Sequence, residues 1–557
     1  MRRMLPQLLL VFLALAGPTT AQIAMPEGVA LSPLPVSQQP AAYVAFGDGG
    51  GGIWAVFQGA APGSGLYAQH IVEDGSYALG FNAAARLLAA PGTLVNNLSA
   101  GPDGVGGAVI TWFGVNPKDS TSHFLALRYL RINAEGAIPP PLPDTGIVVS
   151  KVASAGMVVG DGLGGAYVAW EELKSPPNPD IVAQHYNDFG VPIWVPSGSA
   201  TGRNVCAVVG IQRLRAIQND GSGGAYVVWA DTRTASTSPL YAMRLLPAGL
   251  AGAPWTTNGV RITPIVPGIR IAGSGTSPAG GLWLAWRDIN VANELDAQHV
   301  TNAAAFQWGA TGAVVTASSP VRVDFVAQPS GDVFVTWGDS DIRCSRMSAA
   351  GVRVWPEPAG RVMVTPPTGT LNVRVIADGA GGQRLAWSFD NAGQTDVNLM
   401  RVDGSGTPWP GEPPLGDPFE ATSAPEEPVA VFVASSGDPV VVWLSAGVMR
   451  ARRVAGTTLG VGHEGHAGPK PALSLSAPAP NPLRGSSLTL HFAAPAGPAR
   501  LDLFDAAGRR VLARMFYSSG GAQALSLDGV TALAPGVYTL RLAAAGHVAS
   551  QRLVRVE

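Results

Sequence analysis

A short motif recurs along most of this chain, and its spacing constrains the fold more than any other feature. Two glycines, four variable residues and a tryptophan recur at 106–112, 164–170, 223–229, 280–286 and 381–387. Weaker copies end at Phe57, Trp337 and Trp443, so there are eight copies, and their final aromatic residues stand 50 to 59 residues apart. A steady repeat of this length is typical of folds built from one small supersecondary unit per repeat.

Each repeat predicts a small antiparallel sheet. Asp161–Gly165 has the composition of a tight turn, because glycine tolerates positive φ and aspartate bonds to its own backbone. The run Ala166–Trp170 is β-branched and aromatic and predicts a strand. Tyr167 and Val168 point to opposite faces of that strand, and both are apolar. Both faces of the sheet must therefore be covered by neighbours. A third strand is predicted at Ile181–Tyr186, with a fourth after it.

These features predict an all-β fold, an eight-bladed β-propeller over residues 22–456. Immunoglobulin-type sandwiches need about 100 residues per unit, and no crossover helices separate the strands as a parallel sheet requires. The eighth repeat lacks a fourth strand, whereas Pro26–Pro33 resembles the fourth strand at Trp308–Thr316. We expect this N-terminal segment to complete the last blade, so that strand exchange closes the ring and leaves no open edge.

The N-terminus and the composition indicate export. Residues 1–21 have a charged start, an apolar run at Leu5–Ala16 and a small-residue cleavage site, which are the marks of a secretory signal peptide. No other stretch approaches the ~18 apolar residues of a transmembrane helix, so none is expected after cleavage. Charged residues make up only 13% of the chain and the net charge is −2. Without a basic stripe, nucleic-acid binding is not expected.

Neither cysteines nor metals are expected to hold the fold together. Cys206 and Cys344 fall in different repeats, too far apart for the ~7 Å that a disulfide allows between Cα atoms, and we predict both to be buried and unpaired. His70, His185 and His299 each end an Ala-Gln-His triplet, but they lie in the first, third and fifth repeats. Zinc ligands must converge within ~2.1 Å of one ion, so no metal site is predicted there.

Each predicted third strand carries a basic residue, and an acidic residue often follows the tryptophan of the second strand. We predict cross-strand ion pairs between these two sets. The bases are His70, Arg128, His185, Arg244, His299, Arg346, Arg401 and Arg452, and the acids are Glu171, Asp231, Asp288 and Asp339.

Other acidic residues give no clear site. Asp48, Asp103, Asp161, Asp220 and Asp378 open the glycine-rich turns, where turn formation explains them better than calcium binding, which needs several carboxylates per loop. Asp188, Glu294, Asp296, Asp324, Asp341 and Asp396 are non-repeating acids near loops. No nucleophile elbow, zinc-protease or phosphate-loop motif is present. We therefore assign no catalytic, cofactor-binding or metal residues and expect no cofactor. Asn97 begins a lone glycosylation sequon.

The repeat ends near residue 456, and a different pattern follows. Residues 457–477 are rich in glycine, proline and histidine and predict a linker. Residues 478–557 predict a small immunoglobulin-like β-sandwich, with strands at Leu488–Phe492, Ala499–Phe504, Arg510–Phe516, Gln523–Leu527, Gly536–Ala543 and Ser550–Val556. A hairpin loop at Asp505–Gly508 joins two of them.

This last segment resembles a known family of export domains. The order of Pro480-Asn481-Pro482, Leu501–Asp505 with Gly508–Val511, and Leu533–Tyr538 is similar to the C-terminal sorting domains of type IX secretion cargo. It also resembles the immunoglobulin-like domain of flagellar hook-capping proteins. The resemblance implies a bacterial protein that crosses the periplasm and is secreted or held at the outer-membrane surface, with residues 478–557 as the contact to the secretion machinery.

Three functions remain open from the sequence. The first is a non-enzymatic propeller that binds an extracellular glycan, polymer or protein. The second is a propeller-type polysaccharide hydrolase or lyase, which needs two carboxyl groups about 5–9 Å apart. The third is a structural or adhesive surface component. Near-uniform repeats favour the first, because active sites usually interrupt a repeat with long insertions, and those at 116–123 and 175–180 are short.

Overall fold

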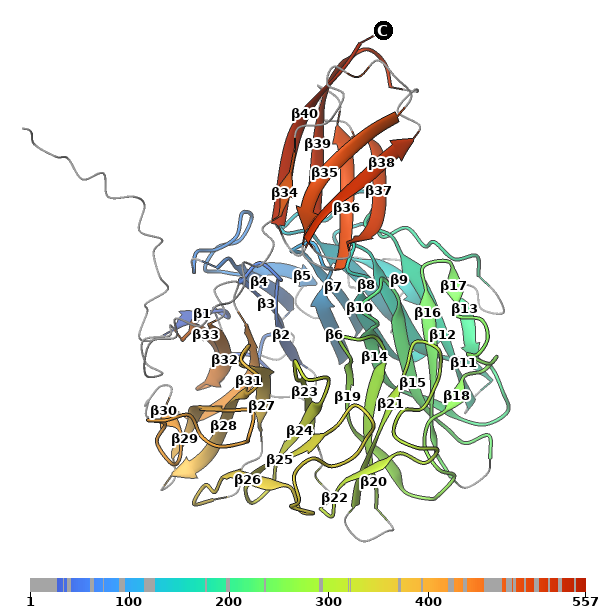
Figure 1. Cartoon of the computed structure of the whole chain (residues 1–557). Helices are drawn as coiled ribbons and strands as arrows, with labels where there is room; N and C mark the ends of the chain where they lie inside the picture. Colours follow the sequence, from blue (N-terminus) through green and yellow to red (C-terminus); the bar gives the residue numbers. More distant parts are fainter. Residues whose placement is uncertain are drawn as a thin grey trace, which may run out of the picture.

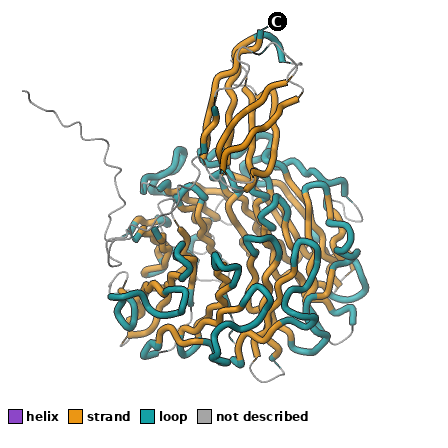
Figure 2. The backbone as a smooth tube through the Cα atoms, in the orientation of Figure 1, coloured by secondary structure: helices purple, strands orange, loops and turns teal. Residues whose placement is uncertain are grey.

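The fold is all-β, and the part of the chain that the structure describes contains no helix (Figure 2). The computed structural model describes residues 28–556 except 34, 38–41, 61–64, 74, 90–95, 115–125, 176–177, 197–200, 235–236, 290–293, 319, 321, 369–371, 392–393, 419–424, 434–437, 455–472, 477–482, 484–486, 495–496, 505–509, 519–520, 529–532 and 545–546. The predicted signal peptide, the hairpin loop at 505–508 and the insertion at 116–123 lie outside the described residues. Within them, no segment has the length and apolar character of a membrane-crossing helix.

Among the described residues, eight antiparallel sheets precede residue 456, and each takes three to five strands that follow one another in the chain. The first four are β2 (Tyr43–Gly47), β3 (Ile53–Gln58), β4 (Leu66–Ile71) and β5 (Arg86–Ala89); β6 (Asn96–Pro102), β7 (Ala108–Gly114), β8 (Ala126–Ile132) and β9 (Ile147–Ser150); β10 (Ala153–Gly160), β11 (Ala166–Ser175), β12 (Asn178–Tyr186) and β13 (Arg203–Cys206); and β14 (Gln212–Asn219), β15 (Ala225–Asp231), β16 (Leu240–Leu246), β17 (Gly249–Leu250) and β18 (Val260–Arg261).

The other four sheets follow the same plan, except that the last takes a strand from the N-terminus. They are β19 (Ile269–Thr276), β20 (Leu282–Asp288), β21 (Glu294–Val300) and β22 (Ala313–Thr316); β23 (Asp324–Ala327), β24 (Val333–Gly338), β25 (Ile342–Met347) and β26 (Arg361–Val364); β27 (Arg374–Ala377), β28 (Gln383–Asn391), β29 (Gln394–Val402) and β30 (Asp417–Pro418); and β31 (Glu426–Val433), β32 (Pro439–Ser445), β33 (Val448–Arg453) and β1 (Val29–Ala30).

The sheets are arranged around an axis in a propeller-like manner (Figure 1). The first strand of each sheet contacts the first strand of the next, from β2 through to β31, and β31 in turn contacts β2. We call these eight first strands the inner strands. A shared apolar cluster joins the first and eighth sheets, with Phe57 on one side and Val442 on the other.

A tryptophan lies at the centre of most sheets, as the repeat predicts. The final aromatic residues of all eight motifs are at most 1% exposed. Tyr167 and Val168 are both fully buried, which confirms that β11 is covered on both faces. Burying a side chain of this size stabilises the fold by about 1.5–3 kcal/mol, so the repeated aromatic residue accounts for much of the core.

A glycine with positive φ packs on that tryptophan just before the outermost strand. Gly259 (φ 84°) precedes β18, and a Cβ built on it meets the Trp229 ring at 2.2 Å. Gly28 (φ 68°) holds the same place before β1, where its Cβ meets the Trp443 ring at 2.4 Å. β1 pairs antiparallel with β33, so the N-terminal segment occupies the position of a fourth strand in the eighth sheet.

The C-terminal residues form two further sheets (Figure 1). One holds β34 (Ser474–Leu475), β35 (Ser487–Ala494) and β38 (Gly521–Asp528), and the other holds β37 (Arg510–Ser518), β36 (Gly497–Phe504), β39 (Gly536–Ala544) and β40 (His547–Arg555). The six strands expected from the sequence all occur here, shifted by a few residues at most. β34 lies within the segment that composition predicts as a linker. A shared core of leucines, including Leu490 and Leu540, fills these sheets.

Candidate functional site

Every propeller sheet has two ends, and they differ in chemistry. The glycine-rich turn that joins the first and second strands lies at one end, which we call the turn end. The second-to-third hairpins and the connections between sheets lie at the other, which we call the loop end. The turn from the third strand also falls at the turn end, since antiparallel neighbours alternate in direction.

At the turn end, turn aspartates make two kinds of contact. One carboxylate oxygen of Asp161 accepts the backbone N–H groups of Leu163 and Gly165 at 2.8 and 2.9 Å, which closes the turn. Its other oxygen lies 2.9 Å from Nε2 of His185. The same arrangement recurs along the chain in the pairs Asp48–His70, Asp103–Arg131, Asp220–Arg244 and Asp378–Arg401, and Asp332 of the sixth turn makes only the ion pair, with Arg346.

Five of the eight predicted third-strand bases form ion pairs, but with acids of the turns and not with the predicted acids, and His299 contacts the Gly280 carbonyl instead. In the third sheet His185 lies opposite Tyr167, whereas Glu171 lies opposite Ile181 at the far end of the strand. The register therefore places the base beside the turn aspartate. The basic position also shifts in two sheets, where Arg131 and Arg453 make the pairs expected of Arg128 and Arg452.

These contacts give His70 and His185 polar partners within their own sheets. His70 stacks on Trp54 with ring centroids 4.3 Å apart, and His185 stacks on Tyr167 at 4.2 Å. Burial alone would raise the pKa of Asp48, but hydrogen bonds from His70 and from two turn amides lower it. Among the described residues, no group of three histidine, cysteine or acidic side chains could hold a metal ion.

The two cysteines are buried and unpaired, as predicted. Burial raises the pKa of each thiol to about 12. Neither thiol is therefore ionised near neutral pH, and neither has the character of a nucleophile.

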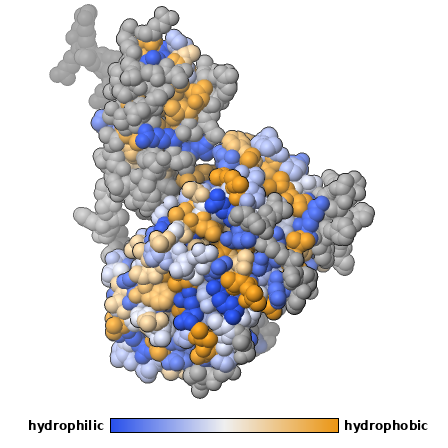
Figure 3. All heavy atoms as spheres, turned by 90° about the vertical axis from the view of Figure 1, so that its right-hand side faces the viewer, coloured by the Kyte–Doolittle hydropathy of each residue, from blue (hydrophilic) through white to orange (hydrophobic). Residues whose placement is uncertain are grey.

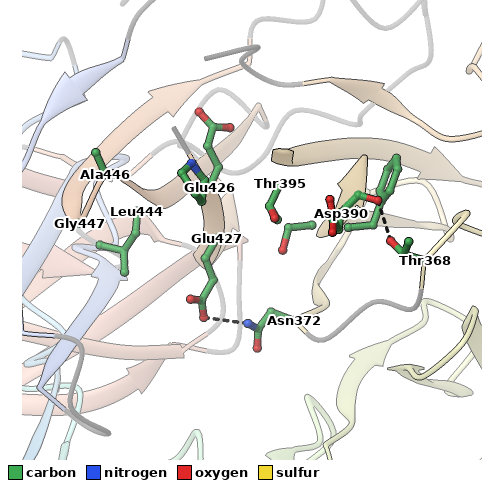
Figure 4. A pocket seen from close by; sticks show the side chains of 12 residues that line it. Thr368, Asn372, Asp390, Thr395, Glu426, Glu427, Leu444, Ala446 and Gly447 are labelled. Atoms are coloured by element: carbon green, nitrogen blue, oxygen red, sulfur yellow. Dashed lines mark hydrogen bonds between the residues drawn. The ribbon is translucent and has the colours of Figure 1, made fainter. Parts of the chain in front are cut away.

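At the loop end, a pocket of about 460 Å³ opens between the seventh and eighth sheets (Figure 4). Asn372 donates a hydrogen bond of 2.7 Å from Nδ2 to Oε1 of Glu427, across the boundary between the sheets. Asp390 and Thr395 face them from the β28–β29 hairpin. The full lining is Thr368, Asn372, Ser388, Phe389, Asp390, Thr395, Pro425, Glu426, Glu427, Leu444, Ala446 and Gly447. The pocket thus combines hydrogen-bonding groups with a few apolar ones.

Another pocket, of about 490 Å³, lies at the turn end between the fifth, sixth and seventh sheets. Glycine, alanine and proline from three turns form most of its wall, with Trp283, Gln328 and Asp332. Asp332 is already paired with Arg346 at 2.7 Å. This pocket therefore offers fewer groups for recognition than the one at the loop end.

The six non-repeating acids do not come together in one site. Asp188 lies at the turn end and pairs with Arg500 of β36 at 3.3 Å, and Asp341 pairs with Arg343. Glu294 and Asp296 share β21, where burial and the charges of Glu294 and Asp288 raise the pKa of Asp296 to about 7. The remaining two are Asp324 on β23 and Asp396 on β29.

Sequence reasoning missed the residues that matter most at the loop end. Asn372 and Glu427 stand at the starts of two inner strands, and arginines stand at the starts of others. The available signal was the presence of charged side chains on strands that are otherwise apolar. The repeated motif covers the second strand of each sheet, so it carries no information on how the first strands differ in their polar residues.

No protein-family model matches the chain, and no curated protein matches its sequence. It is similar to solved structures that include PorZ, a surface component of the type IX secretion system of Porphyromonas gingivalis, at 11% identity over 95% of this chain and 100% of that one, with a TM-score of 0.24. The BP39L lectin of Burkholderia pseudomallei matches at 14% identity over 75% and 99%, with a TM-score of 0.33. A polysaccharide lyase of family PL25, an ulvan lyase, matches at 10% over 77% and 94%, with a TM-score of 0.34. At these TM-scores the likeness carries no function over to this chain.

Proposed function

We propose that this protein is an exported, surface-associated eight-bladed β-propeller that binds an extracellular glycan at its loop end. In this proposal β1 closes the ring as the fourth strand of the last blade, and residues 478–557 form an immunoglobulin-like domain that routes the protein to the cell surface. The propeller acts as a binding module and performs no chemistry.

The pocket between the seventh and eighth sheets is the observation that carries the proposal. Sugar recognition needs side chains that both donate and accept hydrogen bonds, fixed in place on a rigid frame. Asn372, Glu427 and Asp390 supply donors and acceptors, and the first two are held by their mutual hydrogen bond. Their positions follow from the starts of β27 and β31 and from the β28–β29 hairpin, so folding alone prepares the site.

The position of the C-terminal sheets supports the same conclusion. Their ion pair with the propeller, Arg500 to Asp188, lies at the turn end. The pocket opens at the opposite end, so an anchor attached through the C-terminal sheets leaves the pocket accessible. A surface receptor needs this separation between its attachment and its binding site.

The test is binding of the full mature chain to a panel of polysaccharides, measured by affinity electrophoresis and calorimetry. We expect Asn372→Ala to weaken binding of the best polysaccharide about tenfold, since one hydrogen bond to a charged group contributes about 1.5 kcal/mol. Asn82→Ala, at an exposed turn of the first sheet, is the matched control. Failure of every polysaccharide to bind would overturn the proposal.

Routing is tested separately by deleting residues 478–557 in the native host and measuring surface exposure of the propeller. We expect the shortened protein to remain in the periplasm. Unchanged surface exposure would mean that this segment does not direct export.

A further inference from the structure

Arginines gather at the loop end of four neighbouring inner strands. Arg213 and Arg215 lie on β14, Arg270 on β19 and Arg374 on β27, and Arg322 stands two residues before β23. These four strands contact one another in sequence. Arg213 lies opposite Ala230, and Arg270 lies opposite Arg287, in each case one residue beyond the central tryptophan. Arg215 is near enough to Arg213 and Arg270 to feel their charges, and Arg374 is near enough to Arg322. We call the five side chains the inner arginine cluster.

Acidic side chains neutralise only part of this cluster. Arg213 pairs with Glu171 at 2.8 Å, and Arg322 lies 3.8 Å from Asp324. Among the described residues, no carboxylate lies within 4.0 Å of Arg215, Arg270 or Arg374, so these three guanidinium groups lack an ion-pair partner.

The three unpaired arginines are held by backbone carbonyls instead. Arg374 donates to the oxygens of Val429 and Val373 at 2.9 and 3.1 Å. Within the described part of the chain, Arg215 and Arg270 donate to the carbonyls of the residues before them, at 3.1 and 3.0 Å. A guanidinium has five N–H donors, so each of the three has donors that these bonds do not use. Arg215 and Arg270 are exposed, and their free donors face solvent or whatever binds there.

The positive charges affect one another. Burial and the nearby Arg322 lower the pKa of Arg374 to about 10, against the attraction of Asp324 and Glu427. Partial burial, Arg213 and Arg270 lower the pKa of the surface residue Arg215, against the attraction of Glu171. Burial is the largest cause of both shifts, and the neighbouring arginines add to it because like charges disfavour the charged form.

The third-strand arginines show that this arrangement is not general in the molecule. Arg244, Arg346 and Arg401 each pair with the turn aspartate of their own sheet at 2.7 to 2.9 Å. A partly buried charge without a partner costs stability, so the need for a stable fold does not explain the unpaired arginines on the inner strands. A bound anion would supply the missing partner.

We infer that the inner arginine cluster binds the carboxylate or sulfate groups of an acidic polysaccharide. The inference rests on the proposed glycan function and names the class of glycan. Arginine forks match planar and tetrahedral anions with paired hydrogen bonds. Arg374 follows Asn372 by two residues and donates to the Val429 carbonyl of β31, the strand that carries Glu427. The pocket in Figure 4 offers the amide of Asn372 and the carboxylate of Glu427 to sugar hydroxyls.

The acids between the arginines distinguish this ligand from a nucleic acid. Glu171, Asp324 and Glu427 stand among the arginines, and the whole chain has a net charge of −2. A nucleic acid places a phosphate at every nucleotide and requires a continuous positive surface. An acidic polysaccharide alternates charged groups with hydroxyls, and hydroxyls donate to such carboxylates.

The experiment compares four probes on the full mature chain: polygalacturonate, dextran sulfate, neutral dextran of matched length, and an oligothymidylate. We expect at least one of the two acidic polysaccharides to bind at least tenfold more tightly than neutral dextran and to weaken as salt is raised. The two acidic probes distinguish carboxylate from sulfate as the preferred anion.

Substitutions then locate the site. Arg270→Gln is expected to weaken binding of the acidic polysaccharide by about ten- to a hundredfold, the range for loss of a charge-assisted contact. Arg215→Gln with Arg270→Gln should weaken it further. Arg261→Gln, which removes an exposed arginine from the outer strand β18, should leave it unchanged. Circular dichroism and the melting temperature confirm that the variants fold.

The possible outcomes distinguish failure of this inference from failure of the proposed glycan function. Binding of neutral dextran as tight as that of both acidic polymers, or binding unaffected by Arg270→Gln, overturns the inference and leaves the glycan function in place. Oligothymidylate that binds as tightly as the acidic polysaccharides also overturns it. Failure of every polysaccharide to bind overturns both.

Discussion

The two ends of the propeller sheets differ in whether their charged side chains are paired. At the turn end, turn aspartates close their own turns and pair with bases from the same sheets, as Asp161 does with His185. At the loop end, the charges differ from sheet to sheet, and Arg215, Arg270 and Arg374 have no carboxylate partner among the described residues. The turn end repeats because every sheet needs the same turn, whereas the loop end varies because folding does not require its charges.

This contrast separates residues that stabilise the fold from residues that are available for binding. Neutralised, buried and repeated pairs indicate stability, and exposed, unpaired and irregular charges indicate recognition. Substitutions at the turn end should therefore change stability, and those at the inner arginine cluster should change binding.

The largest effect is expected at a buried turn aspartate. Asp103→Ala removes the partner of Arg131, whose side chain is 8% exposed, and two hydrogen bonds of 2.8 Å that close the turn. Leaving a buried charge unpaired costs about 3–5 kcal/mol. Urea unfolding measures the loss, with the exposed Asp144→Ala as control. A decrease in the free energy of unfolding below about 1 kcal/mol would show that the turn pairs contribute little, and the two ends would then not differ as described.

A substitution at the joining strand should have the next largest effect. Gly28→Val adds a branched side chain at positive φ, and its Cβ would meet the Trp443 ring at 2.4 Å. We expect about 2–3 kcal/mol of destabilisation, seen in the melting temperature together with faster proteolysis of the N-terminal segment. Gly252→Val, where no atom lies within 4 Å of a built Cβ, controls for the added side chain. Equal behaviour of the two variants would argue against β1 as part of the closed ring.

A loop-end acid should give a smaller, pH-dependent effect. Burial and two like charges raise the pKa of Asp296 to about 7, so between pH 4 and 7 the folded state binds more protons than the unfolded state. Stability should fall as the pH rises through that window, and the penalty is complete above it. The full shift corresponds to about 4 kcal/mol, which solvent screening reduces to about 1–2 kcal/mol.

Asp296→Asn should therefore raise the melting temperature at pH 8 and leave it unchanged near pH 4. Asp144→Asn, an exposed acid at a loop, should shift neither. Equal gains for Asp296→Asn at both pH values would show that its carboxyl group is not the cause.

The smallest effect is expected where the C-terminal sheets meet the turn end. Arg500→Gln removes the 3.3 Å ion pair with Asp188, whose members are 15% and 21% exposed, together with a 2.9 Å pair to Asp502 on the same strand. Such pairs contribute about 0.2–1 kcal/mol, so the unfolding midpoint should change little. Arg541→Gln on β39, for which the structure shows no ion pair, is the comparison. A large loss specific to Arg500→Gln would mean that the two regions fold as one unit.

The repeat allowed much of the fold to be predicted. Its glycines and tryptophans recur where turns and buried strands need them, so the strands, their covered faces and the place of β1 beside β33 follow from local preference and spacing. The six C-terminal strands were found by alternation alone, within a few residues of their observed ends.

The partner of each base could not be predicted in the same way. The choice between Asp161 and Glu171 for His185 depends on register, and the two acids lie at opposite ends of one strand. The shift from Arg128 to Arg131 has the same origin, because Arg131 lies opposite Val109 near the turn, whereas Arg128 lies opposite Trp112 further along the strand. Sequence spacing gives the two candidate sets but not the pairing between strands.

The candidate site could not be predicted from the sequence. Asn372 and Glu427 are 55 residues apart in the chain and meet through a 2.7 Å hydrogen bond only because their sheets are neighbours. The inner arginines come from four sheets for the same reason.

The amino-acid sequence by itself determined the repeating unit, because turn chemistry and the burial of aromatic side chains act over a few residues. Only the tertiary structure decided which charges are neutralised and which are left facing a ligand. Electrostatic partners are set by distances across strands and between sheets, and these distances exist only once the sheets have packed around their common axis.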